Sequence, residues 1–525
     1  MSATYDETMG HLIEANMLKW PDRVMATFES GETWTWSEAH EIGVSGAQAL
    51  RARGLDEHSH VGTLLENGPE WFRAWFSISM LGGTIVPFLP AHRGAVLNDM
   101  LVRSGCKALI TSDELSGRVD SAPSDVQVLN AGDLTSPNGS ADWAGLPDRG
   151  GWDLHALLFT SGTTGPSKAV EVSNHYMLHV GDWWREKSLG IELDESDAFL
   201  CDLPLAHMGG LAACVQMLRV GGRINVRTRP DLRNYWSIIR ETGSTYSILL
   251  STMADFVRSQ PVSSDERGHG LRAILNVPLM RDVPEFRERF GIDHVVTAYA
   301  STEAGVPLVR ASTWDVPEMS CGQLLPGIEG RIADEHDVEL PPNTPGELLL
   351  RRSVPWENST GYFGDPGATR AWMRNGWVHT GDIMSVDAEG NFSFHDRGKD
   401  YLRRRGENVS SYEVEREALA HPAVVEAACV GVKDDGGNDE IKIFLVCAPD
   451  QTVDAPQMLE FLADRMAHFM VPRFYEFVPD LPKTDTGRVK KVQLRSAPHG
   501  DSAWDLVAAG YSMTRAGLSR PATHV

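Results

Sequence analysis

Three features that are common in other classes of protein are scarce or missing in this sequence. Basic residues are outnumbered, with 48 Lys and Arg against 72 Asp and Glu and a formal net charge of −24, which argues against nucleic acid or an anionic membrane surface as a partner. The six cysteines form no Cys-x-x-Cys pair, so the sequence predicts neither a zinc site nor a disulfide framework and is typical of a reducing cytoplasm. No apolar run approaches the roughly 20 residues that span a bilayer, and the acidic, polar first residues are not those of a secretory signal.

What is present is the composition of an ordinary globular protein, in a chain of 525 residues that is long enough for two or more domains. Up to about residue 153, short apolar strands alternate with helices such as 38–53 and 71–81, which predicts an α/β fold with a parallel sheet covered on both faces. From about 322 to 396 the segments are shorter, with Pro and Gly between them, and predict a barrel-like β subdomain. The residues from there to about 496 predict a compact α+β unit.

The stretch Leu157–Val170, which reads LLFTSGTTGPSKAV, is the most informative part of the chain. A short apolar run with the length of a buried strand breaks abruptly into a loop of glycines, hydroxyl side chains and one lysine. Glycine lets backbone N–H groups approach a ligand closely, and such groups with hydroxyls and a nearby cation form a cradle for phosphate. The alternative is a solvent-exposed turn, the usual structure of such a composition. The loop residues are Thr160, Ser161, Gly162, Thr163, Thr164, Gly165, Pro166, Ser167 and Lys168.

This loop resembles the phosphate-binding loop of the adenylate-forming superfamily, which comprises acyl-CoA synthetases, luciferases and the adenylation domains of peptide synthetases. Two positions depart from the commonest form of that loop, Ser167 in place of proline and Ala169 in place of glycine. Neither change removes a hydroxyl or the lysine. The resemblance implies that the loop holds the phosphates of ATP, with Thr160 and Lys168 also acting in catalysis.

Two later stretches match the same superfamily. His207 follows a predicted strand, where the resemblance implies a residue between the ATP and acyl sites; a hydrogen-bonded core histidine is the alternative. In the string Tyr299-Ala-Ser-Thr302-Glu303, the resemblance implies that the tyrosine stacks on adenine, the threonine serves the phosphates and the glutamate holds Mg²⁺. Adenine suits an apolar planar partner, and magnesium prefers carboxylate oxygen beside substrate phosphates.

A helix is predicted over 174–187, between the loop and His207. It carries Trp183 and Trp184, and we interpret both as ordinary core residues and not as a wall of the acyl pocket. Their type alone favours this interpretation, because large aromatic side chains are mostly buried in a core.

The segment from Trp377 to Asp382 places a carboxylate after a turn. An aspartate is the expected acceptor for ribose hydroxyls, and the alternative is a turn aspartate bonded to the backbone. The charged cluster that follows at 396–400 resembles the superfamily's hinge. The resemblance implies that Arg397 also contacts ribose and that the C-terminal domain rotates at Lys399.

Beyond the hinge, one stretch that matches the superfamily bears on CoA binding, and one position that departs from it bears on adenylation. The string RRRGENVSS looks most like the crotonobetaine/carnitine-CoA ligase-like branch and implies that Gly406 lies beside the path of CoA; the arginines at 403–405 either attract CoA phosphates or form a solvated face. Arg488 stands where the superfamily normally has the lysine that bridges carboxylate and phosphate, and arginine presents a planar fork in place of a compact charge. Three interpretations are open: Arg488 does that work less well, Lys483 or Lys490 substitutes for it, or adenylation is slow or lost. We favour the first.

We predict an ATP-dependent carboxylic acid–CoA ligase that works through acyl-AMP, using ATP, Mg²⁺ and coenzyme A. The alternatives are an enzyme that delivers the acyl group to a carrier protein and a weakly catalytic binding homologue. The predicted domains are 1–398, a lid domain over 399–500 and a peripheral tail over 501–525, and a homodimer is compatible with the sequence. The residues predicted to act in catalysis are Thr160, Lys168, His207, Glu303, Lys399 and Arg488. The residues predicted to bind ATP or CoA are Thr160, Ser161, Gly162, Thr163, Thr164, Gly165, Lys168, Tyr299, Thr302, Glu303, Asp382, Arg397 and Gly406, with Glu303 as the metal ligand.

Overall fold

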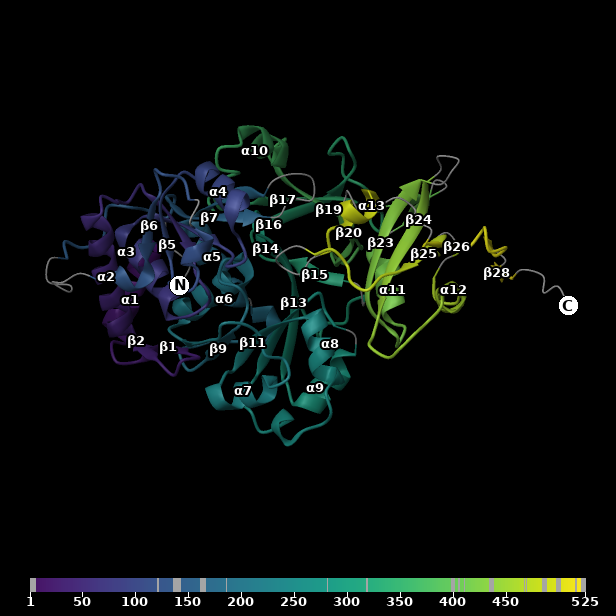
Figure 1. The fold of residues 1–525 in the computed structure, drawn as a ribbon, viewed down its shortest axis with the longest axis horizontal. Coiled ribbons are helices and arrows are strands. Elements are labelled where there is room, and N and C mark those ends of the chain that lie inside the picture. Colours follow the sequence, from purple (N-terminus) through teal and green to yellow (C-terminus); the bar gives the residue numbers. More distant parts are fainter. Residues whose placement is uncertain are drawn as a thin grey trace.

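A large N-terminal body of two sheets and a smaller C-terminal unit make up the computed structural model of this chain (Figure 1). The predicted α/β class, with a small α+β unit at the C-terminal end, is confirmed. The structure describes residues 6–119, 122–135, 143–160, 167–185, 187–280, 282–317, 320–397, 402–404, 407–409, 411–433, 439–466, 468, 470–483, 489–496, 502–514 and 517–520.

The first sheet is parallel except at one edge. Its strands, in the order in which they lie side by side, are β6 (Gln127–Asn130), β5 (Cys106–Thr111), β3 (His60–Leu64), β4 (Thr84–Phe88), β7 (Leu154–Thr160) and β8 (Lys168–Ser173). Neighbouring strands are parallel apart from β7 and β8, which are antiparallel. Every residue of β4 is buried, as expected of a strand covered on both faces. The predicted parallel sheet is therefore present, with one antiparallel strand added at its edge.

The second sheet has 14 strands and changes character along its length. Its strands, in spatial order, are β16 (Ile328–Ala333), β17 (Gly346–Arg352), β19 (Trp377–Val386), β20 (Phe392–Arg397), β15 (Ser320–Leu324), β14 (Gly305–Ala311), β13 (His294–Ser301), β12 (Ala273–Val277), β11 (Tyr246–Leu250), β9 (Ala198–Cys201), β10 (Arg223–Val226), β1 (Val24–Phe28) and β2 (Thr33–Thr35), with β18 (Met373–Arg374) paired to β19. Neighbours are parallel from β1 to β13 and antiparallel from β13 to β16. The predicted barrel-like subdomain is thus the antiparallel end of this same sheet.

Helices cover the sheets and connect them. Those of the N-terminal body are α1 (Met9–Lys19), α2 (Trp36–Ala52), α3 (Pro69–Leu81), α4 (Gly94–Arg103), α5 (Asn174–Val180), α6 (Met208–Val220), α7 (Tyr235–Thr242), α8 (Ser251–Ser259), α9 (Val283–Phe290) and α10 (Pro366–Trp372). Helix α5 packs on β7 and β8, α6 packs on β9 and β10, and the two helices contact each other. This pair therefore joins the two sheets.

Local sequence signals set the ends of several helices. Helix α3 begins at Pro69, because proline is favoured in the first turn, where its missing N–H is not needed. It ends at Gly82, which has a left-handed φ of 77° and whose N–H donates to the carbonyl of Ile78. Helix α2 begins after Thr35, which forms a capping box with Glu38. The predictions for these two helices are therefore confirmed to within a few residues.

The prediction of a single helix over 174–187 is wrong beyond Val180. Helix α5 is capped by Gly181, whose φ of −76° is not that of a left-handed glycine stop. At this glycine the chain runs so close to α6 that an added Cβ would lie 3.1 Å from the backbone nitrogen of Gln216. Trp183 and Trp184 follow in a separate 3₁₀ turn, at 183–185. Packing against α6, and no local signal, therefore redirects the chain here.

The C-terminal unit is a mixed sheet with helices on it. Its elements are β21 (Leu402–Arg404), β22 (Glu407–Val409), α11 (Ser411–Leu419), β23 (Val424–Lys433), β24 (Asp439–Cys447), α12 (Ala455–Ala463), β25 (Phe474–Phe477), α13 (Lys491–Ser496), β26 (Trp504–Asp505), β27 (Ser512–Thr514) and β28 (Gly517–Ser519). Helix α11 contacts β20 of the N-terminal body, where the rings of Tyr412 and Phe394 lie 5.9 Å apart. The predicted domain boundary at 398 lies outside the described residues, so it stays a prediction.

The prediction of a peripheral tail over 501–525 is wrong for its first residues. Trp504 and Asp505 form strand β26, which pairs with β25 in the C-terminal sheet. The Asp505 carboxylate accepts a hydrogen bond from Arg473 at 2.9 Å, and Leu506 is buried. These residues are thus part of the core of the C-terminal unit, because a pairing partner, an ion pair and apolar contacts hold them there.

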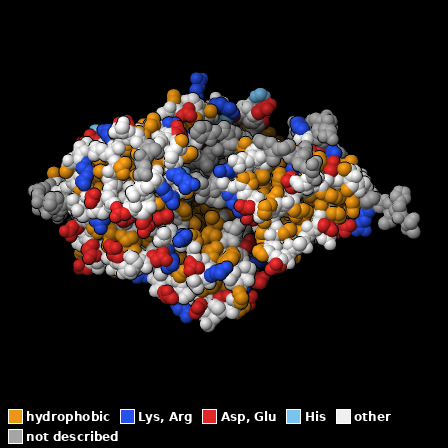
Figure 2. Space-filling model, in the orientation of Figure 1, with side chains coloured by type: hydrophobic (Ala, Val, Ile, Leu, Met, Phe, Trp, Pro, Cys, Tyr) orange, Lys and Arg blue, Asp and Glu red, His pale blue; other side chains and the backbone are white. Residues whose placement is uncertain are grey.

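The surface carries both signs of charge. On the face shown in Figure 2, acidic and basic side chains are interspersed, and the surface is hollowed where the C-terminal unit meets the large body. Among the described residues we find no helix with the length and apolar character that a bilayer crossing needs.

Candidate functional site

A cleft of about 1110 Å³ brings together residues from distant parts of the chain. We call one part of it the polar end, which is lined by Thr160, Lys168, Thr302, Glu303 and Asp382. We call the other part the apolar end, which is lined by Trp183, Trp184, Ala212, Ala213, Gln216, Tyr246 and Ile248. The cleft therefore offers two chemically different surfaces in one continuous space.

The ends of the predicted phosphate loop lie at the polar end. Thr160 is the last residue of β7 and Lys168 the first of β8, and the two are register partners in the antiparallel pair. The loop thus connects two strands and does not lead directly into a helix, so it differs from the anion sites in which a loop opens a helix. The strand β7 is next to the edge of its sheet and not central. Ser161, Gly162, Thr163, Thr164 and Gly165 lie outside the described residues.

Glu303 lies beside Thr160 at the polar end. Its Oε1 accepts a hydrogen bond of 3.0 Å from the Tyr362 hydroxyl and lies 3.5 Å from Thr160 Oγ1. Burial and the nearby Glu303 carboxylate raise the pKa of Tyr362, so this hydroxyl keeps its proton. The Lys168 ammonium lies 5.0 Å from the centre of the Tyr362 ring, with its side chain exposed to the cleft. A cation, a carboxylate and two hydroxyls thus converge.

The sequence did not predict a role for Tyr362. It reaches this position because residues 361–363 run antiparallel to β8: Val170 and Tyr362 form a β-bridge, and the N–H of Phe363 donates to the carbonyl of Ala169 at 2.8 Å. No motif around residue 362 marks it, and only the pairing of two distant segments shows its place.

The backbone beside Glu303 is held at consecutive carbonyl groups. The Tyr176 hydroxyl donates to the carbonyl of Thr302 at 2.7 Å, and the Ser359 N–H donates to that of Glu303 at 3.0 Å. The Arg352 guanidinium, which is buried, donates to the carbonyl of Ala304 at 2.8 Å. Each of these partners comes from a different element, so the position of the Glu303 carboxylate is fixed by tertiary contacts.

Tyr299 and Asp382 meet across the polar end. The Tyr299 hydroxyl donates to Asp382 Oδ2 at 2.5 Å, and the aspartate is only 5% exposed. Asp382 lines the cleft, and Tyr299 stands between Ala298 and Ala300, which also line it. The structure therefore brings together the two residues predicted for adenine and ribose. Arg397 is the register partner of Asp382 in the pair β19–β20.

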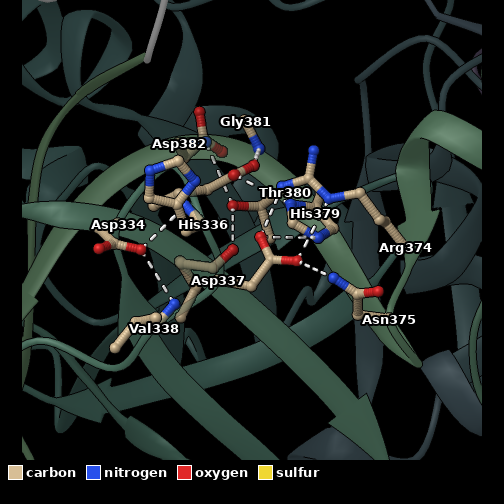
Figure 3. A network of polar contacts seen from close by, with 12 residues as sticks. Asp334, His336, Asp337, Val338, Arg374, Asn375, His379, Thr380, Gly381 and Asp382 are labelled. Atoms are coloured by element: carbon tan, nitrogen blue, oxygen red, sulfur yellow. Dashed lines mark hydrogen bonds and ion pairs between the residues drawn. The ribbon is translucent and has the colours of Figure 1, made fainter.

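The turn that carries Asp382 is braced by a polar network, drawn in Figure 3. Glu347 accepts from the N–H of Gly381 at 2.9 Å and contacts His379 Nδ1 at 3.0 Å, while His379 Nε2 lies 3.7 Å from Asp337. The hydrogen bond from the Arg374 guanidinium lowers the pKa of Asp337 to about 2. The network holds β19 at His379 and at the bend itself, where Gly381 has a φ of 71°.

His207 lines the same cleft, directly before helix α6. Its Nε2 is buried with no hydrogen-bond partner among the described residues. Burial lowers the pKa of its imidazole, and the neighbouring His92 acts in the same direction. A neutral ring therefore faces the cleft. The alternative of a hydrogen-bonded core histidine is not what the structure shows for this nitrogen.

The interpretation of Trp183 and Trp184 as core residues alone is wrong, because both line the apolar end. Their rings lie 4.2 Å apart, and the Trp184 ring meets that of Tyr246 at 4.6 Å and 73°. Trp184 is nearly inaccessible to solvent, so it is both a core residue and a wall of the cleft. Gln216 and Tyr246 lie in no motif, so the sequence did not predict a role for either.

Several predicted residues cannot be placed. Lys399, Gly406 and Arg488 lie outside the described residues, and of Arg397 only the backbone is described. One candidate substitute for Arg488 is engaged elsewhere: Lys483 pairs with Glu426 at 2.7 Å and with Asp480 at 3.2 Å.

Comparison with known proteins agrees with this geometry. The profile of the AMP-binding enzyme family matches residues 13–363, and that of the AMP-binding enzyme C-terminal domain matches residues 413–488. This chain belongs to the AMP-binding enzyme family. The predicted class, an adenylate-forming enzyme of the acid–CoA ligase kind, is thereby confirmed.

Related proteins and solved structures of similar fold align with most of the length of this chain. The crotonobetaine/carnitine–CoA ligase of Proteus mirabilis (strain HI4320) is 28% identical over 503 residues, which are 89% of this chain and 95% of that protein. ATP-bound MatB from Rhodopseudomonas palustris superposes with a TM-score of 0.80 at 25% identity, covering 93% and 98% of the two chains. The anthranilate CoA ligase AuaEII, in complex with anthranoyl-AMP, has a TM-score of 0.85 at 22% identity over 97% and 99%, and shares the fold.

Proposed function

We propose that this protein is an ATP-dependent carboxylic acid–CoA ligase that works through an acyl-AMP intermediate. The observation that carries this proposal is the single cleft, because its polar end suits a nucleotide triphosphate and its apolar end suits the body of an acid. His207 lines the same cleft with a neutral ring, and we place it where the carboxylate and the α-phosphate would meet. Membership of the AMP-binding enzyme family supports the same reaction.

In the first half-reaction, a carboxylate oxygen of the acid attacks the α-phosphorus of ATP. A new bond joins that oxygen to phosphorus, the bond from phosphorus to the bridging oxygen breaks, and pyrophosphate leaves with the electron pair. The obstacle is the approach of two anions. The Lys168 ammonium, with the N–H groups expected of the loop at 161–166, would oppose the charge that grows on phosphorus. Loss of one such preorganised donor typically raises a barrier by about 2.7–4 kcal/mol.

The polar end would hold the rest of the nucleotide. Tyr299 would pack on adenine, and the Asp382 carboxylate, already fixed by the Tyr299 hydroxyl, would accept the ribose hydroxyls. Glu303, with Thr160 Oγ1 3.5 Å away, fits a magnesium ion, which typically binds through one or two carboxylates and substrate phosphates. Such an ion supplies positive charge against the phosphate oxygens.

In the second half-reaction, the thiol sulfur of CoA attacks the acyl carbon of acyl-AMP. A carbon–sulfur bond forms, the bond from carbon to the AMP oxygen breaks, AMP leaves, and the thiol proton passes to solvent. We propose, from the sequence, that the C-terminal unit turns at Lys399 between the two steps and that Gly406 lines the path of CoA. We keep Arg488 as the cation of the first step. The pairing of Lys483 with Glu426 makes that lysine a poor substitute, and Lys490 is the other candidate.

Exchange of labelled pyrophosphate into ATP, measured with each acid of a broad panel, tests the first half-reaction. We expect exchange that depends on an acid, and we expect Arg488→Lys to increase it, while Lys483→Ala leaves it close to the wild-type rate. The absence of exchange with every acid would overturn the enzyme proposal in favour of a binding protein. Formation of acyl-CoA from free CoA then separates a CoA ligase from an enzyme that serves a carrier protein.

For the compartment we propose the cytoplasm. All six cysteines carry free thiols, and the sulfur atoms of Cys201 and Cys214 lie 3.5 Å apart without a disulfide. Such a pair is typical of a reducing environment. A homodimer remains a prediction from the sequence.

A further inference from the structure

One face of helix α6 forms the floor of the apolar end. Gly209, Ala212, Ala213 and Gln216 all line the cleft, at the spacing that places residues on one side of a helix. The first three side chains are small and leave space above the helix. Met208, at the start of the helix, also lines the cleft, and Gln216 is the long polar side chain on this face, at the point farthest along the helix from His207.

The amide of Gln216 is buried, and no described residue pairs with it. The residue is 2% exposed, and both Nε2 and Oε1 lack a hydrogen bond to any described residue. A primary amide can donate two hydrogen bonds and accept two. Because buried polar groups are nearly always paired, and leaving them unpaired is costly, an orphan amide on a cleft wall points to a group that a ligand supplies.

The surroundings of Gln216 are flat and uncharged. The rings of Trp183 and Trp184 lie beside each other with an interplanar angle of 32°, and Tyr246 meets Trp184 edge-on. Gly181, just before the two tryptophans in the chain, packs directly against the backbone of Gln216, and the side chains of all three line the same cleft. The nearest charge on α6, Arg219, is already bonded to Asp182 and to Glu7, each at 2.9 Å.

We propose that the acid used by this enzyme has a flat, apolar body and carries, at the end away from its carboxylate, a neutral group that both donates and accepts hydrogen bonds, such as a hydroxyl or a primary carboxamide. Gln216 recognises this group, and the rings of Trp183 and Trp184 pack on the flat body. The inference rests on the proposed function, because it assumes that an acid occupies the apolar end.

Two other kinds of tail fit this end less well. The aromatic rings of this end can hold a quaternary ammonium group, but such a group has no N–H for Gln216 Oε1 and no acceptor for Nε2, so it would leave the buried amide unpaired. A second carboxylate would satisfy Nε2 alone, and it would meet no cation among the described residues that line the apolar end. A neutral group with both functions pairs both atoms of the amide.

Matched pairs of acids test the proposal by acid-dependent pyrophosphate exchange. The panel contains benzoic, phenylacetic and cinnamic acids, each with and without a para hydroxyl or carboxamide, together with trimethylammonio acids and dicarboxylic acids. In at least one length class, we expect the wild-type enzyme to prefer the substituted acid in kcat/KM by about tenfold or more, since a site built to bond a hydroxyl rejects the analogue that lacks it.

Gln216→Leu is the decisive variant. It keeps the size of the side chain and removes the amide, so we expect the ratio between the paired acids to fall to about one, with the KM for ATP unchanged. Met217→Leu, at a fully buried position of the same helix that does not line the cleft, is the matched control and should keep the wild-type ratio. If Gln216→Leu does not fold, Gln216→Met removes the same amide with an unbranched chain.

The outcomes separate the inference from the function on which it rests. Three results would overturn the inference and leave the ligase function standing. They are equal exchange with the paired acids, the strongest exchange with acids that have charged tails, and a ratio between paired acids that does not change when the Gln216 amide is removed. If no acid at all supports exchange, the proposed function falls and the inference falls with it.

Discussion

The two ends of the cleft are built in opposite ways. At the polar end, protein groups already pair with one another: Tyr299 donates to Asp382, Tyr362 donates to Glu303, and Arg352 holds the backbone beside it. At the apolar end, the amide of Gln216 has no partner among the described residues. The difference teaches that the polar end is preorganised before any ligand arrives, whereas the apolar end is completed by its ligand.

This contrast has a kinetic consequence. A substitution at the polar end should slow the enzyme with every acid by a similar factor, because all acids use the same ATP. A substitution at the apolar end should change the order in which acids are preferred and leave the KM for ATP alone. The following variants test that division.

Lys168→Ala should have the largest effect. The variant removes the exposed ammonium beside Tyr362 at the polar end, and we expect pyrophosphate exchange to fall by about 100- to 1000-fold with every acid, as when one preorganised donor is lost. Lys107→Ala, at an exposed lysine of β5 that lies outside the cleft and 3.9 Å from Asp56, is the control and should exchange normally. A loss confined to some acids would contradict the division between the ends.

Asp382→Asn should come next. The side chain keeps its shape and loses its charge, and since hydrogen bonds to charged groups are worth about 1.5–3 kcal/mol, the KM for ATP should rise by about 10- to 100-fold. The control is Asp387→Asn, in the turn after β19, where the carboxylate bonds only within its own turn, for example to the N–H of Asn391 at 2.8 Å. A changed preference among acids with an unchanged KM for ATP would count against a role at ribose.

Acid should destabilise the protein through the strand that carries Thr160. His155 on β7 is buried, its Nε2 accepts from Trp75 at 3.2 Å, and burial lowers its pKa from 6.5 to about 4. Because the folded-state pKa lies below that of the unfolded chain, the unfolded chain binds the proton first. The contribution is present above about pH 6.5 and is lost as the pH falls towards 4; at about pH 5 the free energy of unfolding should be lower by about 2 kcal/mol.

Urea unfolding of the wild type and of His155→Gln at neutral pH and at about pH 5 measures this contribution. Glutamine can accept from Trp75 and does not titrate, so the variant should lose less stability on acidification. Equal losses in the two proteins would show that His155 is not the group responsible.

Ala213→Val should have the smallest and most selective effect. The added methyl groups occupy the floor of the apolar end, and since a methylene in such a pocket is worth about 1–3 kcal/mol, kcat/KM should fall by about tenfold for bulky acids and little for short ones. The KM for ATP should not move. Ala213→Gly is the reciprocal variant and should favour bulky acids; a uniform loss with all acids would contradict the assignment of this wall.

The polar end was largely predictable from the sequence, because most of its residues belong to short contiguous motifs. Thr160 with Lys168, and Tyr299 with Glu303, stand a few residues apart within strings whose chemistry suits phosphate, adenine and magnesium. The structure brings these strings together in one cleft. The bracing groups were not predictable, since Tyr362, Arg352 and Tyr176 reach Glu303 from elements far away in the sequence.

The residues of the apolar end could not be predicted from the sequence. The predicted helix over 174–187 ended early because Gly181 packs on α6, and this contact turned Trp183 and Trp184 into walls of the cleft. Gln216 belongs to a helix of otherwise unremarkable composition, and its unpaired amide becomes visible only when the groups around it are placed.

The sequence by itself determined the class of fold, the family and several residues of the polar end, because strand periodicity, helix caps and glycine-rich loops act over a few neighbouring residues. Tertiary structure alone decided which side chains brace Glu303 and which surround the acid. The physical reason is that such walls depend on packing and hydrogen-bond pairing between segments that meet only in the folded chain.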